Sequence, residues 1–90
     1  MKAAAITVKG HLKAFLNYQY KHRLRFKTHE IQDLSARGKE RFGRRIGSTE
    51  TYTRCFRQLR EDGNYTVNKL KSPNSNEAMW QVTSVKEILW

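Results

Sequence analysis

The chain has little cysteine, little histidine and no long apolar run, and each shortage excludes a class of protein. Its 90 residues include one cysteine, Cys55, so no disulfide can form within the chain. The three histidines are scattered, and none is placed with Cys55 at the spacing of a zinc site. No apolar segment approaches the ~20 residues of a transmembrane helix, and the opening MKAAAITV is too short for a signal peptide. We therefore expect a soluble protein in a reducing, cytoplasmic compartment, with no metal or cofactor and no contact with a membrane.

Side-chain patterns for catalysis are scarce as well. The sequence contains no arrangement of serine, histidine and aspartate and no carboxylate pair with a supporting histidine. His11, His22 and His29 fall in or beside expected helices without an evident common site. The glycines of GKERFGRRIG, residues 38–47, lie between two expected helices, whereas a phosphate-binding loop joins a strand to a helix. We expect no catalytic residues and no enzymatic activity.

Acidic residues are few relative to basic ones. The 18 lysines and arginines face 8 acids, which gives a net charge of +10. Such a charge destabilises a small domain by self-repulsion, and a polyanion would relieve it. Twelve of the basic residues precede residue 48, where they are interleaved with aromatic and aliphatic residues as in a folded segment. Composition therefore favours a nucleic-acid partner, bound through its phosphates, over a charge that only keeps the protein in solution.

One domain, residues 1–90, is expected from the length, with a core built from the 38% of hydrophobic residues. Apolar residues at three- and four-residue steps predict a first helix from about Lys9 to Arg23. Residues 24–26 then read as a short extended piece. Thr28 is the expected N-cap of a second helix, which runs from His29 to about Arg37 and ends at a left-handed Gly38. Residues 38–47 form a long turn that Phe42 and Ile46 hold against the core.

The third helix has the clearest signals in the sequence. Ser48 is the expected N-cap and Gly63 the C-terminal stop of STETYTRCFRQLREDG. Its apolar residues recur at helical spacing, which predicts a buried stripe made of Tyr52, Cys55, Phe56 and Leu59. The opposite face then consists of Glu50, Thr53, Arg54, Arg57 and Glu61.

The last third of the chain changes character. Two strand-like runs, residues 65–71 and 78–83, flank a loop of turn-forming residues at 72–76, which predicts a β-hairpin. Alternation places Tyr65, Val67, Trp80 and Val82 on one apolar face. The final apolar residues, Ile88, Leu89 and Trp90, either cover the domain's own core or contact a second copy of the chain.

Three helices followed by a hairpin, with the third helix capped and basic, resemble the winged helix-turn-helix family across almost the whole chain. The resemblance implies an α+β fold, a three-helix bundle with a C-terminal β-hairpin wing. It also implies that helix 48–62 reads the major groove of DNA while the wing, residues 64–83, touches the backbone. The connection at 38–47 departs from the family, whose turn between these helices is tighter.

Candidate DNA-binding residues follow from these placements and from side-chain chemistry. Arginine forks match guanine, glutamine can pair with adenine, and threonine contacts methyl groups or phosphates. The candidates are Arg41, Arg44, Arg45, Ser48, Thr49, Thr53, Arg54, Arg57, Gln58, Lys69, Lys71 and Asn74. For Arg54 and Arg57, ion pairs with Glu50 and Glu61 along an ordinary surface helix are the structural alternative.

The prediction for function is a small transcriptional or replication regulator that binds double-stranded DNA. Two alternatives stay open at this stage. The protein could be a basic RNA-binding or ribosome-associated protein, for which exposed aromatic residues would be needed. It could instead be a protein-interaction adaptor, or a homodimer, that uses the C-terminal apolar residues.

Overall fold

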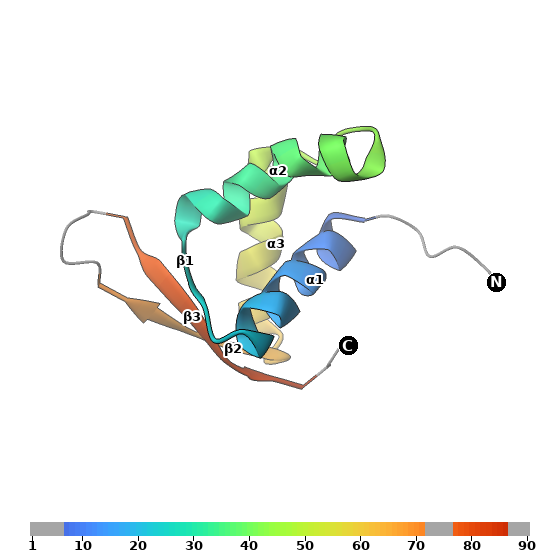
Figure 1. Cartoon of the computed structure of the whole chain (residues 1–90). Coiled ribbons are helices and arrows are strands. Elements are labelled where there is room, and N and C mark those ends of the chain that lie inside the picture. The colour runs from blue at the N-terminus through green and yellow to red at the C-terminus, as the bar shows by residue number, and fades with distance from the viewer. Residues whose placement is uncertain (1–6, 72–76, 87–90) are drawn as a thin grey trace.

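In the computed structural model, residues 7–71 and 77–86 are described, and they form three helices and a three-stranded antiparallel sheet (Figure 1). The elements in chain order are α1 (Val8–Lys21), β1 (Arg25–Lys27), α2 (Thr28–Phe42), α3 (Thr49–Glu61), β2 (Tyr65–Leu70) and β3 (Met79–Val85). The α+β class that was predicted from the sequence is confirmed. None of the helices in the described ranges is long and apolar enough to cross a lipid bilayer.

The sheet has β3 at its centre, with the strand order β1-β3-β2. Strands β2 and β3 form the predicted hairpin, which is interrupted by an irregular register between Thr66 and Val67. The extended piece after α1 becomes β1, in which Phe26 lies opposite Trp80. Figure 1 shows the hairpin extending beyond the helices, and α3 running from beside α2 to the start of β2.

All three helices and all three strands contribute to a single core. Leu12 and Leu16 of α1, Ile31 and Leu34 of α2, and the predicted stripe of α3 are buried. Aromatic rings connect these elements edge to face. The distance between ring centres is 5.3 Å for Phe15 and Phe26, 5.8 Å for Phe26 and Phe56, and 5.2 Å for Phe56 and Trp80. Such contacts add to the stabilisation from burial, so this row of rings holds α3 onto the sheet.

The first helix ends two residues earlier than predicted. Lys21 is its last residue, and Arg23 takes a left-handed backbone conformation with φ of 54°. The Leu24 N–H then donates to the Gln19 carbonyl at 2.9 Å, which satisfies one of the carbonyls at the helix end. This turn directs the chain into β1.

The start of α2 differs from the prediction, because Thr28 is the first helical residue and Lys27 precedes it as the N-cap. The Lys27 N–H donates to the Glu30 carboxylate at 2.7 Å. The Thr28 hydroxyl accepts a hydrogen bond of 3.0 Å from the Trp80 indole N–H. The prediction of Thr28 as N-cap was therefore wrong, because a partner from the sheet engages the hydroxyl that would have capped the helix.

Glu77 and Ala78, immediately before β3, hold the hairpin to the N-terminus of α2. The Glu77 carboxylate accepts from the backbone N–H of His29 at 2.5 Å and pairs with His29 Nδ1 at 3.0 Å. The Ala78 carbonyl accepts from the Thr28 N–H at 3.3 Å. The hydrogen bond to Glu77 raises the pKa of His29, and the same contact lowers the pKa of Glu77. An acid at a helix N-terminus is also favoured by the helix dipole.

The predicted end of α2 at Gly38 was wrong as well. Gly38 lies on the buried face of a helix that continues to Phe42, and the left-handed stop is Gly43, with φ of 79°. A Cβ at position 38 would lie 3.5 Å from the Tyr52 hydroxyl and 3.7 Å from Ile46, so the glycine is enclosed by neighbouring elements. Packing outweighs the low helix propensity of glycine here. The connection to α3 is correspondingly short, covering residues 43–48.

Two contacts fix that connection. The Ser35 hydroxyl donates to the Gly47 carbonyl at 2.6 Å. A Cβ at Gly47 would collide with the Val8 side chain, so only glycine leaves room for the first residue of α1 at this point. The chain then enters α3 directly. Ile46 is half-buried against the core as predicted, while the Phe42 ring packs edge to face against His11 at 5.0 Å.

A buried polar pair predicts how stability depends on pH. His11 Nδ1 and the Tyr52 hydroxyl share a hydrogen bond of 2.7 Å. Burial, and secondarily the charge of Arg41, lowers the pKa of His11. The unfolded chain therefore binds a proton more readily, with a pKa near 6.5. We expect the contribution of His11 to the free energy of unfolding to be complete above that pH. It should decrease as the pH falls toward the lower pKa of the folded state.

Urea unfolding of the wild type and His11→Gln between pH 7.5 and 5 measures this dependence. The wild type should lose more stability than the variant on acidification. His29 is present in both proteins, and its raised pKa acts in the opposite sense, so the difference between them isolates His11. Parallel pH profiles would contradict the assignment.

Candidate nucleic-acid interface

The sequence of α3 sets both of its ends, as predicted. The Ser48 hydroxyl accepts from the Thr51 N–H at 3.2 Å, and Gly63 has a left-handed φ of 78° just beyond the helix. The predicted stripe of Tyr52, Cys55, Phe56 and Leu59 is buried. Burial also raises the pKa of the Cys55 thiol, which keeps that side chain protonated.

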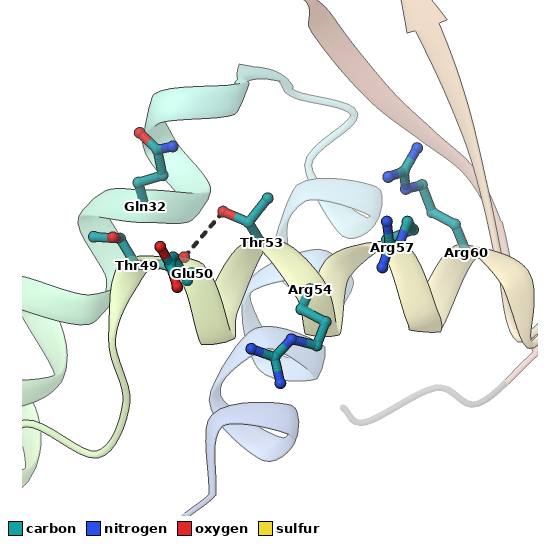
Figure 2. A pocket seen from close by; sticks show the side chains of 7 residues that line it. All are labelled: Gln32, Thr49, Glu50, Thr53, Arg54, Arg57 and Arg60. Atoms are coloured by element: carbon teal, nitrogen blue, oxygen red, sulfur yellow. Dashed lines mark hydrogen bonds between the residues drawn. The ribbon is translucent and has the colours of Figure 1, made fainter.

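With that stripe buried, the other side of α3 faces outward. The residues predicted for this face are all exposed, as are Thr49 and Gln58: Glu50, Thr53, Arg54, Arg57 and Glu61. An open hollow of about 460 Å³ lies along it (Figure 2). Its lining residues are Gln32, Thr49, Glu50, Thr53, Arg54, Arg57 and Arg60. Figure 2 shows Gln32 reaching the hollow from α2 beside the start of α3, and Arg60 lying at the other end next to the strands.

The two predicted base-reading arginines are held loosely. Arg57 Nε lies 3.9 Å from the Glu61 carboxylate, with the two side chains 65% and 69% exposed. An ion pair this exposed contributes little, so Arg57 can exchange it for another partner. Within residues 7–71 and 77–86, no ion pair holds Arg54. The predicted structural alternative thus describes Arg57 only, and weakly.

The threonines of α3 present methyl groups. The Thr53 hydroxyl donates to the Thr49 carbonyl one turn earlier, at 2.9 Å. Its donor is thereby used within the helix, while the Thr53 residue itself is exposed. The Ser48 hydroxyl oxygen, by contrast, already accepts the hydrogen bond that caps the helix. Glu50 brings a negative charge into the hollow and offsets part of the arginine charge.

The remaining candidates lie at different distances from this face. Arg44 and Arg45 are exposed in the connection that leads into α3. Arg41, in the last turn of α2, lines a separate hollow between α1 and α2, together with Phe15 and Tyr18. Its guanidinium lies 5.5 Å from the Phe42 ring. Arg41 is therefore not brought together with the outer face of α3.

On the hairpin, Lys69 and Lys71 are exposed. The Lys69 ammonium lies 5.8 Å from the centre of the Trp80 ring. Asn74 falls outside the described residues, as does the C-terminal segment 88–90 that was considered for dimer or partner contacts.

Sequence reasoning missed Arg60 and Gln32. The Arg60 guanidinium lies over two rings, 4.6 Å from the centre of Phe56 and 4.5 Å from that of Trp80. The i, i+4 spacing from Phe56 to Arg60 is a signal for the first contact. The second contact comes from a strand that is remote in sequence, and no local pattern indicates it. Gln32 is one of several polar residues on α2, and no pattern distinguishes it.

Among the described residues, no group of histidines, cysteines or acids is placed to hold a metal ion. Comparison of the chain with models of protein families, with curated proteins and with solved structures finds no match. The function is therefore argued from the chemistry and geometry of the site.

Proposed function

We propose that the protein binds double-stranded DNA as a winged helix-turn-helix domain. In this proposal α2 and α3 are the helix-turn-helix, α3 enters the major groove, and the hairpin of β2 and β3 is the wing. The element order and the sheet order β1-β3-β2, with α3 followed directly by the hairpin, support the assignment. The connection at 43–48 is shorter than the turn at 38–47 that the sequence predicts, so it lies closer to the tight turn of the family.

The observation that carries the proposal is the outer face of α3. Arg54, Arg57 and Thr53 are all exposed there on one helix; among the described residues no ion pair holds Arg54, and only a weak one holds Arg57. The major groove is about 12 Å wide and admits a helix. Arginine can donate both hydrogen bonds of its fork to guanine, and threonine methyl groups pack against thymine methyls. This face is therefore suited to select among sequences.

Affinity would come from elsewhere. The face of α3 holds acidic as well as basic residues, whereas most of the basic excess precedes it in the chain. Arg44 and Arg45 are exposed in the connection just before the N-terminus of α3. Lys69 lies on the wing, near the C-terminal end of α3. Phosphate contacts by these residues fix the protein on the duplex, and α3 discriminates among sequences. Such a division of labour suits a small regulator of transcription or replication.

An RNA-binding role has less support. Recognition of single-stranded RNA relies on exposed aromatic rings that stack on bases. Among the Phe, Tyr and Trp residues in the described part of the chain, Tyr18 is the only exposed one, with 55% of its surface accessible. It lies on α1, away from the hollow on α3.

Selection of bound oligonucleotides from a random pool tests the proposal. Duplex DNA, single-stranded DNA and RNA pools of equal length are offered to the full chain, and the enriched sequences are titrated at several salt concentrations. We expect enrichment of duplexes that share a short sequence, with affinity falling as salt rises. Preferential recovery of RNA or single strands, or duplexes without a common sequence, would contradict it.

A further inference from the structure

Arg60, Trp80 and Lys69 meet where α3 adjoins the hairpin, and we call them the junction cluster. The Arg60 guanidinium and the Lys69 ammonium both lie against the Trp80 ring, at 4.5 Å and 5.8 Å from its centre. Trp80 is only 8% exposed, and its indole N–H donates to Thr28 on α2. Two cations from different elements therefore lie over one ring, and a hydrogen bond to a third element fixes the edge of that ring.

The guanidinium of Arg60 is only partly satisfied by polar contacts. Its Nε is buried, and among the described residues it has no hydrogen-bond partner. Burial lowers the pKa of Arg60, while the nearby charges of Glu61 and Arg57 act on it in opposite senses. The guanidinium stays charged at neutral pH, because arginine is protonated throughout this range. Its desolvation is therefore compensated only in part, by the two ring faces.

A purely structural role would explain part of this arrangement. Long side chains often cover apolar surface with their aliphatic stems, and Arg60 covers Phe56 and Trp80. That role needs no charge, however, and it does not require a second cation on the same ring. Arg60 also lines the hollow of α3 together with Arg57, one turn earlier on the helix. Three cations thus surround the junction of the proposed recognition helix and wing.

We propose that Arg60 and Lys69 bind backbone phosphates of one DNA strand at this junction, an inference that rests on the proposed function. The guanidinium and ammonium N–H groups donate to the anionic phosphate oxygens, and no base is contacted. Because stacking has already ordered Arg60, little side-chain entropy is lost on binding. This phosphate contact would fix the position of α3 along the major groove. Arg60 would thereby determine which bases lie opposite Arg54 and Arg57.

A double-mutant cycle between protein and DNA tests this. The DNA is a duplex recovered by the selection above, prepared with a single neutral methylphosphonate at each position in turn. We expect one position, or two adjacent ones, where neutralisation weakens binding of the wild type but not of Arg60→Gln. At the same positions, neutralising the phosphate should weaken the binding of Lys69→Gln less than that of the wild type, or not at all. In unmodified duplex, each substitution should lower the dependence of log affinity on log salt by about one unit.

Arg37→Gln is the matched control, because Arg37 is an exposed arginine in the hollow between α1 and α2. It should retain the full methylphosphonate profile. If Arg60→Gln does not fold, Arg60→Met keeps an apolar stem over Phe56 and Trp80 without the charge, and the same profile is measured with it.

The outcomes separate the two proposals. A wild type that binds no duplex contradicts the proposed function itself. A wild type that binds duplex with an unchanged salt dependence and an unchanged profile in the Arg60 variants overturns the junction site alone, and leaves Arg60 with its structural role.

Discussion

Replacing Arg54 or Arg57 with alanine should reduce discrimination between the selected duplex and a random one by roughly 1–3 kcal/mol. Both side chains are exposed on the hollowed face of α3, and in the part of the chain that the structure describes neither is held by a strong ion pair. Truncation would leave a guanine edge without its two donors, and that loss is specific to the cognate sequence. Competition titrations at one fixed salt concentration, with both duplexes, measure it.

The same titrations show what a negative result would mean. Equal losses on cognate and random duplexes would assign these arginines to phosphate contacts and leave α3 without a base-reading role. Arg37→Ala provides the comparison for loss of a positive charge elsewhere on the surface, because Arg37 does not line the α3 hollow. It should change both affinities alike or leave them unchanged.

Phe56→Ala should lower the free energy of unfolding by about 3–5 kcal/mol, as truncation of a buried aromatic typically does. Phe56 is 2% exposed and packs against the rings of Phe26 and Trp80. The chain has no internal disulfide to offset this loss. The total free energy of unfolding of a small domain is only about 5–15 kcal/mol. The variant should therefore be marginally folded.

Urea unfolding measures the effect as a shift in midpoint with an unchanged slope. Gln58→Ala, at an exposed position on the same helix, should stay within about 0.5 kcal/mol of the wild type. A loss below about 1 kcal/mol in Phe56→Ala would mean that the neighbouring rings close over the space, and that the aromatic row is not what holds α3 to the sheet.

Local signals account for how well α3 was predicted. Ser48 and Gly63 act on the backbone of their own turns, and the spacing from Tyr52 to Leu59 reports the buried face whatever it packs against. Gly38 shows where such signals fail. Its position next to Tyr52 and Ile46 makes it part of the core, so a residue that usually ends helices lies within α2.

Contacts between remote segments account for what the sequence could not reveal. The pairing of β1 with β3 and the engagement of Thr28 by Trp80 join residues that are far apart in the chain. Arg60 belongs to the same class, because one of its two rings is supplied by β3. The pattern of the third helix correctly indicated that Arg54 and Arg57 are exposed, but it could not indicate that the fold immobilises Arg60.

The absence of a side chain at Gly47 has a consequence for the placement of α3. Val8, at the first turn of α1, occupies the space next to Gly47, and Gly47 immediately precedes the cap of α3. The close approach of Val8 to Gly47 thus ties the start of α3 to α1, a helix that lies outside the proposed helix-turn-helix. A larger side chain at position 8 would press on the residue before the cap of α3 and shift the start of that helix, while every residue on its outer face stays the same.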